Sequence, residues 1–140
     1  MKVAFDTNIL LDALANRAGY QEAQALITLV ANQRIEGLIP ASSVTDIYYI
    51  ARKYIGDERA RAAIRNLLTL FDISSVDDEV CLTALDVPMK DYEDAVLAVC
   101  SARAGADFIV TRDREFWEAD SAVPAKSPQD CLDMIASDDA

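Results

Sequence analysis

The chain has 140 residues, enough for one domain with a sizeable core. It carries a net charge of −11 and no histidine, which excludes structural zinc sites, zinc hydrolases, Ser-His-Asp triads and Cys-His dyads. The charge argues against a general nucleic-acid-binding protein, because phosphate contacts need Lys and Arg, but it allows a nuclease whose acidic site holds divalent cations. Hydrolytic chemistry in this chain must therefore rest on carboxylates, which favour a hard metal ion as partner.

The sequence contains no apolar run of the roughly 18 residues that a membrane span needs. Asp6 interrupts the N-terminal apolar stretch, and no basic region or small-residue cleavage site marks a signal peptide. We therefore expect a cytoplasmic protein. Repeats, low-complexity tracts and linkers are absent, which predicts a single domain over residues 1–136 and a short acidic tail over residues 137–140.

Alternating short strands and helices are predicted along the whole chain. In order, they are a strand over 2–6, helices over about 8–15 and 20–32, a strand over 37–40, a helix capped by Ser42 or Ser43 and reaching about Tyr54, a helix that Asp57 can cap, a strand over 71–73, helices over about 77–85 and 92–104, a strand over 107–110, a strand near 123–125, and a last helix starting at Ser127-Pro128. Gly105 is suited to end the helix before it. This alternation predicts an α/β sandwich around a mostly parallel sheet.

Two aspartates occupy similar places in this pattern. Asp6 follows the apolar strand Lys2-Val3-Ala4-Phe5, and Asp113 comes just after the strand that ends at Val110. The carboxyl ends of strands in open parallel sheets form the ligand-binding edge. We therefore expect the two carboxylates to share one cleft.

A third candidate, Asp94, lies in the first turn of the helix that leads into the strand before Asp113. That helix runs antiparallel to the strand, so its N-terminus is expected on the same side as the cleft. A carboxylate there is also favoured by the helix dipole. Its neighbours have ordinary interpretations, Asp91 as an N-cap and Glu93 as a first-turn acid.

Asp46 is the fourth candidate, because its helix also starts at the carboxyl end of a strand. Two structural interpretations compete with a site role: a first-turn partner of the helix dipole, or a capping box with Ser43. The remaining acidic clusters are interpreted as helix starts, turns or solvated charges: Asp57-Glu58, Asp77-Asp78-Glu79, Asp86, Asp120 and Asp138-Asp139.

Several sequence pieces occur together in a characteristic order: F-D-T-N-I-L-L-D at residues 5–12, Asp46, D-Y-E-D-A-V-L-A at 91–98, and D-F-I-V-T-R-D-R-E-F at 107–116. Together they resemble the PIN-domain nucleases, above all small single-domain proteins similar to the VapC-type toxins of toxin–antitoxin modules. The resemblance extends over essentially the whole chain. It implies a three-layer α/β/α sandwich with a central, mostly parallel sheet.

The resemblance also implies an activity, a Mg²⁺- or Mn²⁺-dependent endoribonuclease that hydrolyses RNA phosphodiester bonds as the toxin of such a module. The family's acidic quartet carries over to Asp6, Asp46, Asp94 and Asp113. Asp6 and Asp94 are the expected direct metal ligands, Asp113 would bind a second ion or a metal-bound water, and Asp46 would complete the set. The second position is more often glutamate in this family, so contact through a water, or a contribution from Glu93, is an alternative for Asp46. Whether one ion or two bind is left open.

Supporting roles are expected around the quartet. Thr7 and Asn8 could orient ligands or the scissile phosphate, or instead cap the following helix. Thr111 could hydrogen-bond Asp6 or a water. The candidates for RNA phosphate contacts are basic: Arg17, Arg52, Lys53, Arg112 and Arg114. Phe116 and Trp117 are interpreted as packing residues.

Two other functions compete with this one. A metal-dependent phosphatase would need a second acid at the position of Asn8 and a lysine near the last acid, which disfavours it. A PIN-fold module that binds RNA or a partner with weak or no catalysis is the alternative to the nuclease, and the intact quartet argues against it. The resemblance further implies a homodimer and a cognate antitoxin protein that blocks the site.

Overall fold

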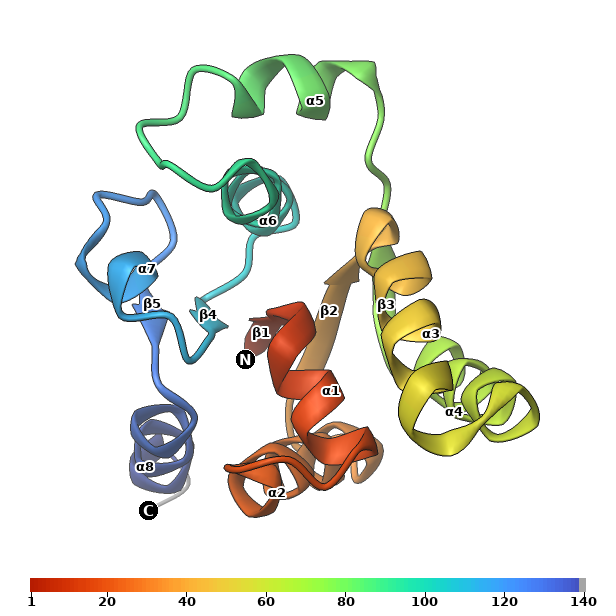
Figure 1. Ribbon diagram of the computed structural model, residues 1–140. Helices are drawn as coiled ribbons and strands as arrows, with labels where there is room; N and C mark the ends of the chain where they lie inside the picture. Colours follow the sequence, from red (N-terminus) through yellow and green to blue (C-terminus); the bar gives the residue numbers. More distant parts are fainter. Residues whose placement is uncertain (139–140) are drawn as a thin grey trace.

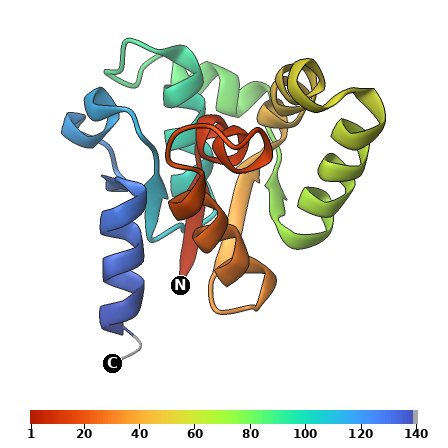
Figure 2. The ribbon, with the colours of Figure 1, turned by 60° about the horizontal axis from the view of Figure 1, so that its bottom comes forward.

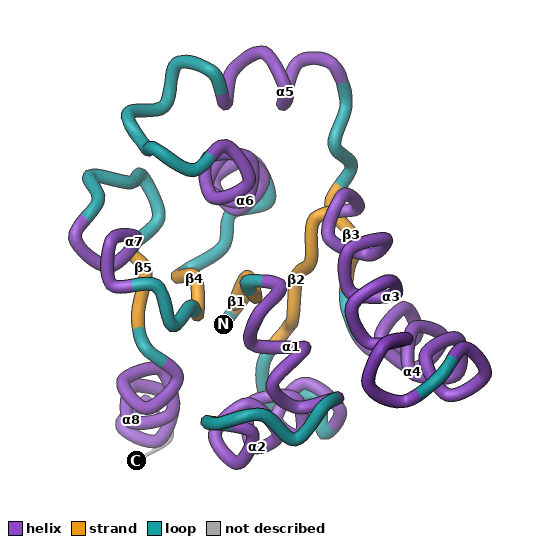
Figure 3. The backbone as a smooth tube through the Cα atoms, viewed as in Figure 1, coloured by secondary structure: helices purple, strands orange, loops and turns teal. Residues whose placement is uncertain are grey.

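The computed structural model describes residues 1–138, whose centre is one five-stranded sheet of order β3-β2-β1-β4-β5. The strands are β1 (Lys2–Phe5), β2 (Glu36–Pro40), β3 (Asp72–Ser74), β4 (Phe108–Val110) and β5 (Ala125–Lys126). Every neighbouring pair is parallel. In Figure 3 the strands lie between helices on either side.

Eight helices connect and cover the strands within these 138 residues. They are α1 (Thr7–Leu14), α2 (Tyr20–Ala31), α3 (Ala41–Ile55), α4 (Asp57–Leu70), α5 (Asp78–Ala84), α6 (Tyr92–Arg103), α7 (Arg114–Glu118) and α8 (Pro128–Asp138). Figure 1 shows α1, α2 and α8 on one side of the sheet and α5 and α6 on the other, with the α3–α4 hairpin beside β3. Turned by 60°, the molecule shows α8 and the α3–α4 hairpin at opposite ends (Figure 2). The predicted α/β/α sandwich is confirmed.

Strand alternation divides the core between the two faces of the sheet. Val3 and Phe5 of β1 pack into the cluster built with α1, α2, α3, α4 and α8, whereas Ala4 packs with α6 and α7 on the other face. Each of these three side chains is fully buried. The period of two along β1 therefore fixes which helices lie on which side.

β1 lies at the topological switch point of the sheet. The chain moves from β1 to β2 and β3 in one direction and then returns to place β4 and β5 on the other side of β1. Phe5 pairs with Val110 of β4, and the Asp6 N–H donates to the Val110 carbonyl at 3.0 Å. Ligands of open α/β sheets bind outside the carboxyl ends of the strands at such a point.

The predicted helix limits hold best where capping residues define them. The Ser127 hydroxyl accepts from the Asp130 N–H at 3.1 Å, Pro128 is the first residue of α8, and Gly105 has a φ of +70° just after α6. The expectation that Ser42 or Ser43 caps α3 is wrong, because α3 begins at Ala41 after Pro40. Pro40 has a fixed φ and an extended ψ of 142°, so the bend comes from the proline backbone and not from a side-chain cap.

Two further expectations need correction, and one helix was not expected. Asp57 is the first residue of α4 and Gly56 precedes it as the N-cap. No pattern in the sequence predicted α7, a helix of five residues. α8 continues through Asp138, so the first two residues of the expected tail are helical, and the last two lie outside the described residues.

Candidate active site

Four separate elements bring the four predicted aspartates to one edge of the sheet. Asp6 directly follows β1, Asp46 is the sixth residue of α3, Asp94 is the third residue of α6, and Asp113 precedes α7 as its N-cap. All four line one pocket of 530 Å³. The first-turn and capping-box interpretations of Asp46 fail, because α3 starts earlier than expected and puts this residue in its second turn.

The pocket is rich in oxygen ligands. Its lining consists of Asp6, Thr7, Asn8, Asp46, Ile50, Asp91, Glu93, Asp94, Arg112 and Asp113. The supporting candidates Thr7, Asn8 and Glu93 line the same pocket as the quartet. Asp6 is the N-cap of α1 and its side chain makes no capping hydrogen bond, so Thr7 and Asn8 are the first two residues of the helix and not its cap. Asp91 does cap α6, accepting from the Asp94 N–H at 3.1 Å, and it also faces the pocket.

Thr111 connects two members of the quartet, Asp6 and Asp113, by hydrogen bonds. This fully buried residue donates its hydroxyl hydrogen to Asp6 Oδ2 at 2.7 Å and accepts from the Asp113 N–H at 3.1 Å. The Asp113 carboxylate in turn accepts from the Glu115 N–H at 3.0 Å, which makes it the cap of α7. The expected hydrogen bond between Thr111 and Asp6 is confirmed, and it ties the end of β1 to the end of β4.

Crowding of the carboxylates raises their proton affinity. Partial burial, together with the charges of Asp6, Asp91 and Asp113, raises the pKa of Asp94 to about 7. Burial also raises the pKa of Asp6, in spite of the hydrogen bond from Thr111. These carboxylates repel one another, so the cluster favours either protons or cations.

Glu93 lies against Asp46 on the α3 side of the pocket. Burial and contact with the Asp46 carboxyl both raise the pKa of Glu93. Asp46 is one methylene shorter than the glutamate more common at this position, and Glu93 of α6 adds a second carboxyl beside it. Sequence reasoning treated the two as alternatives, whereas the fold puts them side by side.

Among residues 1–138, Arg112 is the one basic side chain in the pocket lining, and a buried acid holds it there. Asp12 of α1 is only 1% exposed; its Oδ1 accepts from Arg112 Nη2 at 3.0 Å, and Arg112 Nε lies 2.6 Å from Oδ2. That closer contact is ionic, because Oδ2 has no partner in hydrogen-bond geometry. Arg17 Nε adds a second ionic contact to Asp12 at 3.5 Å.

Sequence reasoning missed the role of Asp12. The available signal was an acid inside the apolar run Ile9-Leu10-Leu11-Asp12-Ala13, since a buried carboxylate needs cationic partners. Two other arginines predicted to contact RNA, Arg52 and Arg114, do not line the pocket. The packing interpretation is right for Phe116, which is 1% exposed, whereas Trp117 is 38% exposed and donates its indole N–H to the Thr111 carbonyl at 2.8 Å.

The donors of the pocket fit a hard cation by their chemistry. They are carboxylate oxygens, with the Asn8 amide and Thr7 hydroxyl beside them, and such oxygen ligands suit Mg²⁺ and Mn²⁺. Within residues 1–138, no three acidic or thiol side chains converge closely enough to form a complete ligand set. The fit therefore rests on donor type and on the raised pKa of Asp94, to which burial contributes most and the negative charges of Asp6 and Asp91 add.

This sheet topology and this acidic edge are those of a PIN domain. A family model described as PIN domain matches residues 2–115, so the chain belongs to that family. No helix within the described part of the chain could cross a membrane.

Similar proteins agree with the family. Ribonuclease VapC1 of Aquifex aeolicus (strain VF5) is 26% identical over 129 residues, which cover 87% of this chain and 88% of that protein. Among solved structures, VapBC2 from Rickettsia felis bound to a DNA fragment from its promoter gives a TM-score of 0.68 at 15% identity, covering 91% of this chain and 98% of that one. Mycobacterium tuberculosis VapC20, a sarcin-ricin loop cleaving toxin, gives 0.61 at 16% identity, with 76% and 86% covered. The two structures share the fold with this chain.

Proposed function

We propose that this chain, as one PIN-like domain, is a divalent-metal-dependent endoribonuclease and the toxin of a toxin–antitoxin module. The observation that carries the proposal is the convergence of Asp6, Asp46, Asp94 and Asp113 on one pocket at the switch point of the sheet. A ribonuclease relative that covers most of the chain supports the reaction class.

Asp6, Asp94 and Asp113 would hold Mg²⁺ or Mn²⁺, and Asp46 with Glu93 would complete the acidic wall. A bound ion lowers the pKa of a coordinated water and stabilises negative charge on the phosphate in the transition state. The residues of the chain provide the rest: Thr111 orients Asp6 through its 2.7 Å hydrogen bond, and Asp91 positions the first turn of α6 that carries Asp94.

Arg112 supplies a fixed positive charge to this acidic pocket. Asp12 engages Nε and Nη2, which leaves the other guanidinium N–H groups free to contact a phosphate oxygen. We therefore propose Arg112 as a phosphate contact. Arg17, which also pairs with the buried carboxylate, is a weaker candidate because it lies outside the pocket.

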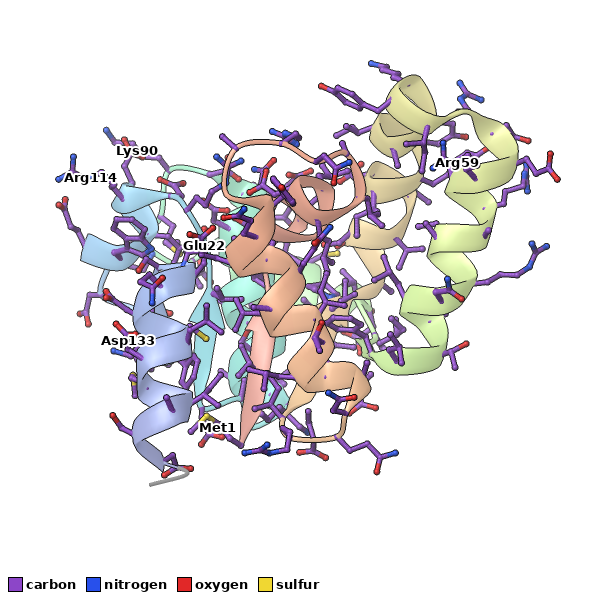
Figure 4. The ribbon with its side chains drawn as sticks, turned by 90° about the horizontal axis from the view of Figure 1, so that it is seen from below. Met1, Glu22, Arg59, Lys90, Arg114 and Asp133 are labelled. Carbon is purple, nitrogen blue, oxygen red and sulfur yellow. The ribbon has the colours of Figure 1, made fainter. Side chains whose placement is uncertain are left out.

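RNA is an unexpected partner for so acidic a chain, but the charges of this chain are unevenly distributed along its sequence. Residues 41–70, the α3–α4 hairpin, hold five of the 13 basic residues and only three of the 24 acidic ones. Arg52 lies over the rings of Tyr48 and Tyr49, at 5.8 and 5.4 Å from their centroids. Figure 4 shows Arg59 of this hairpin at the end of the molecule opposite Arg114. This hairpin, which also carries Asp46, is the proposed surface along which RNA reaches the pocket.

The alternative is a PIN-fold module that binds RNA or a partner protein with little or no catalysis. It predicts RNA binding without metal-dependent cleavage. A phosphatase remains disfavoured, because the residue two positions after Asp6 is Asn8, which lines the pocket but cannot act as an acid.

The test is cleavage of a long structured RNA, such as purified ribosomal RNA, with Mg²⁺, Mn²⁺ or EDTA. Wild type should cut only with metal, and Asp6→Asn and Asp94→Asn should each reduce cutting at least about 100-fold. Asp86→Asn removes an exposed acid outside the pocket and is the matched control, with activity like that of wild type. Cleavage that continues in EDTA or in both site variants would contradict the proposal.

Three further properties belong to the same proposal. A cognate antitoxin is suggested by relatives crystallised as VapBC, and the chain is expected to be a cytoplasmic homodimer. Light scattering of the purified protein tests the dimer. Co-purification with the product of a small neighbouring gene, together with loss of cleavage in the complex, tests the antitoxin.

A further inference from the structure

A second cavity, of 280 Å³, lies directly beside the acidic pocket. It shares Asp6, Thr7, Asp46 and Glu93 with that pocket, so the two have a common wall. Its remaining lining comes from Pro40 at the end of β2, from the start of α3, from α5 and the segment before it, and from the first two turns of α6. A molecule bound in the acidic pocket could therefore extend directly into this neighbouring cavity.

The far wall of the cavity is neutral and largely apolar. Val76, Val96 and Leu97 contribute aliphatic surface, and Tyr92 contributes its aromatic ring. The Tyr92 hydroxyl donates to the Cys81 carbonyl at 2.7 Å, which fixes the ring although the residue is 44% exposed. The cavity thus has an apolar side that includes an aromatic ring held by a hydrogen bond.

Two hydroxyl groups provide hydrogen bonding in this cavity. Ser42 and Ser43 both line it, and neither side chain caps α3. A serine hydroxyl can donate and accept, so it can pair with either kind of group on the edge of a flat heterocycle. Among the described residues, none of those lining the cavity is Lys or Arg, and three are acidic. Without a cation in this lining, the negative charges disfavour a phosphate as occupant and favour a neutral ring.

The size agrees with a single ring system. Pockets for drug-sized ligands measure about 300–1,000 Å³, and this cavity lies just below that range at 280 Å³. Proteins that read single-stranded RNA do so with unstacked bases, held by aromatic faces and by hydrogen bonds to the base edges. Of the bases of a bound RNA, one that neighbours the scissile phosphate would lie closest to the acidic pocket.

We propose that this cavity binds the base of a nucleotide adjacent to the scissile phosphate and so selects where RNA is cut. The proposal rests on the proposed ribonuclease function and adds a specificity-determining subsite to it. Ser42 and Ser43 read the edge of the base, and Tyr92 with Val96 contacts its face.

The experiment compares cut-site distributions, obtained by sequencing the new RNA ends after brief digestion of a long RNA of mixed sequence with Mn²⁺. Ser42→Phe adds a ring at an exposed lining position and should change the relative rates at preferred and other sites about tenfold or more. Ser43→Ala, which removes one hydroxyl without adding bulk, should shift the same ratios about 2- to 10-fold. Ala102→Phe introduces the same ring at an exposed position near the end of α6 and should leave the distribution unchanged.

The ratios are independent of the total amount of active enzyme, so partial loss of folded protein does not affect them. Unchanged distributions in both serine variants, with metal-dependent cleavage retained, would overturn the base-binding cavity and leave the ribonuclease proposal intact. Wild type that does not cut RNA with any divalent metal would instead refute the proposed function itself.

Discussion

Replacing Asp94 with asparagine tests the claim that the carboxylates of the pocket repel one another. The pKa of Asp94 is raised to about 7, chiefly by burial and by the charges of Asp6 and Asp91. A carboxyl whose pKa is higher in the folded than in the unfolded chain stabilises the fold at low pH. That stabilisation is lost as pH rises through the pKa of the folded chain, because the native state then releases the carboxyl proton that it bound more tightly than the unfolded chain does. Wild type without metal should therefore lose stability between pH 5 and pH 8.

The magnitude follows from the pKa. Two pH units between pH 5 and about 7 correspond to about 2.7 kcal/mol at 1.36 kcal/mol per unit, and solvent screening at this half-buried site reduces the effect to about 1–1.5 kcal/mol. Asp94→Asn removes this contribution. Between pH 5 and pH 8, the free energy of unfolding should therefore fall less for Asp94→Asn than for wild type, and the difference should be about 1–1.5 kcal/mol.

Urea denaturation in EDTA at pH 5 and pH 8 measures the difference. Asp86→Asn removes one exposed negative charge away from the pocket and controls for the general effect of net charge. Addition of Mn²⁺ at pH 8 should restore stability to wild type more than to Asp94→Asn, since ligands that bind only the native state stabilise it. Parallel pH profiles for wild type and Asp94→Asn would refute the reasoning about repulsion.

Three further substitutions address the surroundings of the pocket. Thr111→Val removes the hydrogen bond to Asp6 and should slow metal-dependent cleavage about tenfold or more, because hydrogen bonds to charged groups contribute about 1.5–3 kcal/mol; equal rates would contradict the positioning role. Asp12→Ala removes the buried partner of two partly exposed arginines and should cost about 1–3 kcal/mol in urea denaturation, and a neutral effect would show that the pair adds nothing. Gly37→Ala would place a Cβ 2.6 Å from the Phe71 ring, so a loss of about 1–3 kcal/mol is expected in the same assay, and an unchanged midpoint would mean that the ring moves freely.

The sheet edge was predictable because strand ends and apolar periodicity are local signals. Asp6 and Asp113 follow clearly buried strands, and parallel strands bring their carboxyl ends together whatever the intervening sequence does. Asp94 could be placed because its helix must run antiparallel to β4. In each case, a few neighbouring residues were enough to fix the position in the fold.

The features that were missed depend on contacts distant in sequence. Asp12 and Arg112 are 100 residues apart, and only the fold reveals that α1 brings a carboxylate to the segment after β4. α7 is too short to show a helical period, and its N-cap, Asp113, had already been interpreted as a site residue. The start of α3 was misplaced because two serines suggested a side-chain cap, whereas the proline before Ala41 begins the helix.

The most direct test of the central claim is one titration, with RNA cleavage measured as a function of Mn²⁺ concentration. Wild type should show a rate that rises from zero to saturation, and Asp6→Asn and Asp94→Asn should need far more Mn²⁺ or remain inactive, while Asp86→Asn follows wild type. The account would be contradicted by a rate that does not depend on Mn²⁺, or by quartet variants whose titration curves coincide with that of wild type.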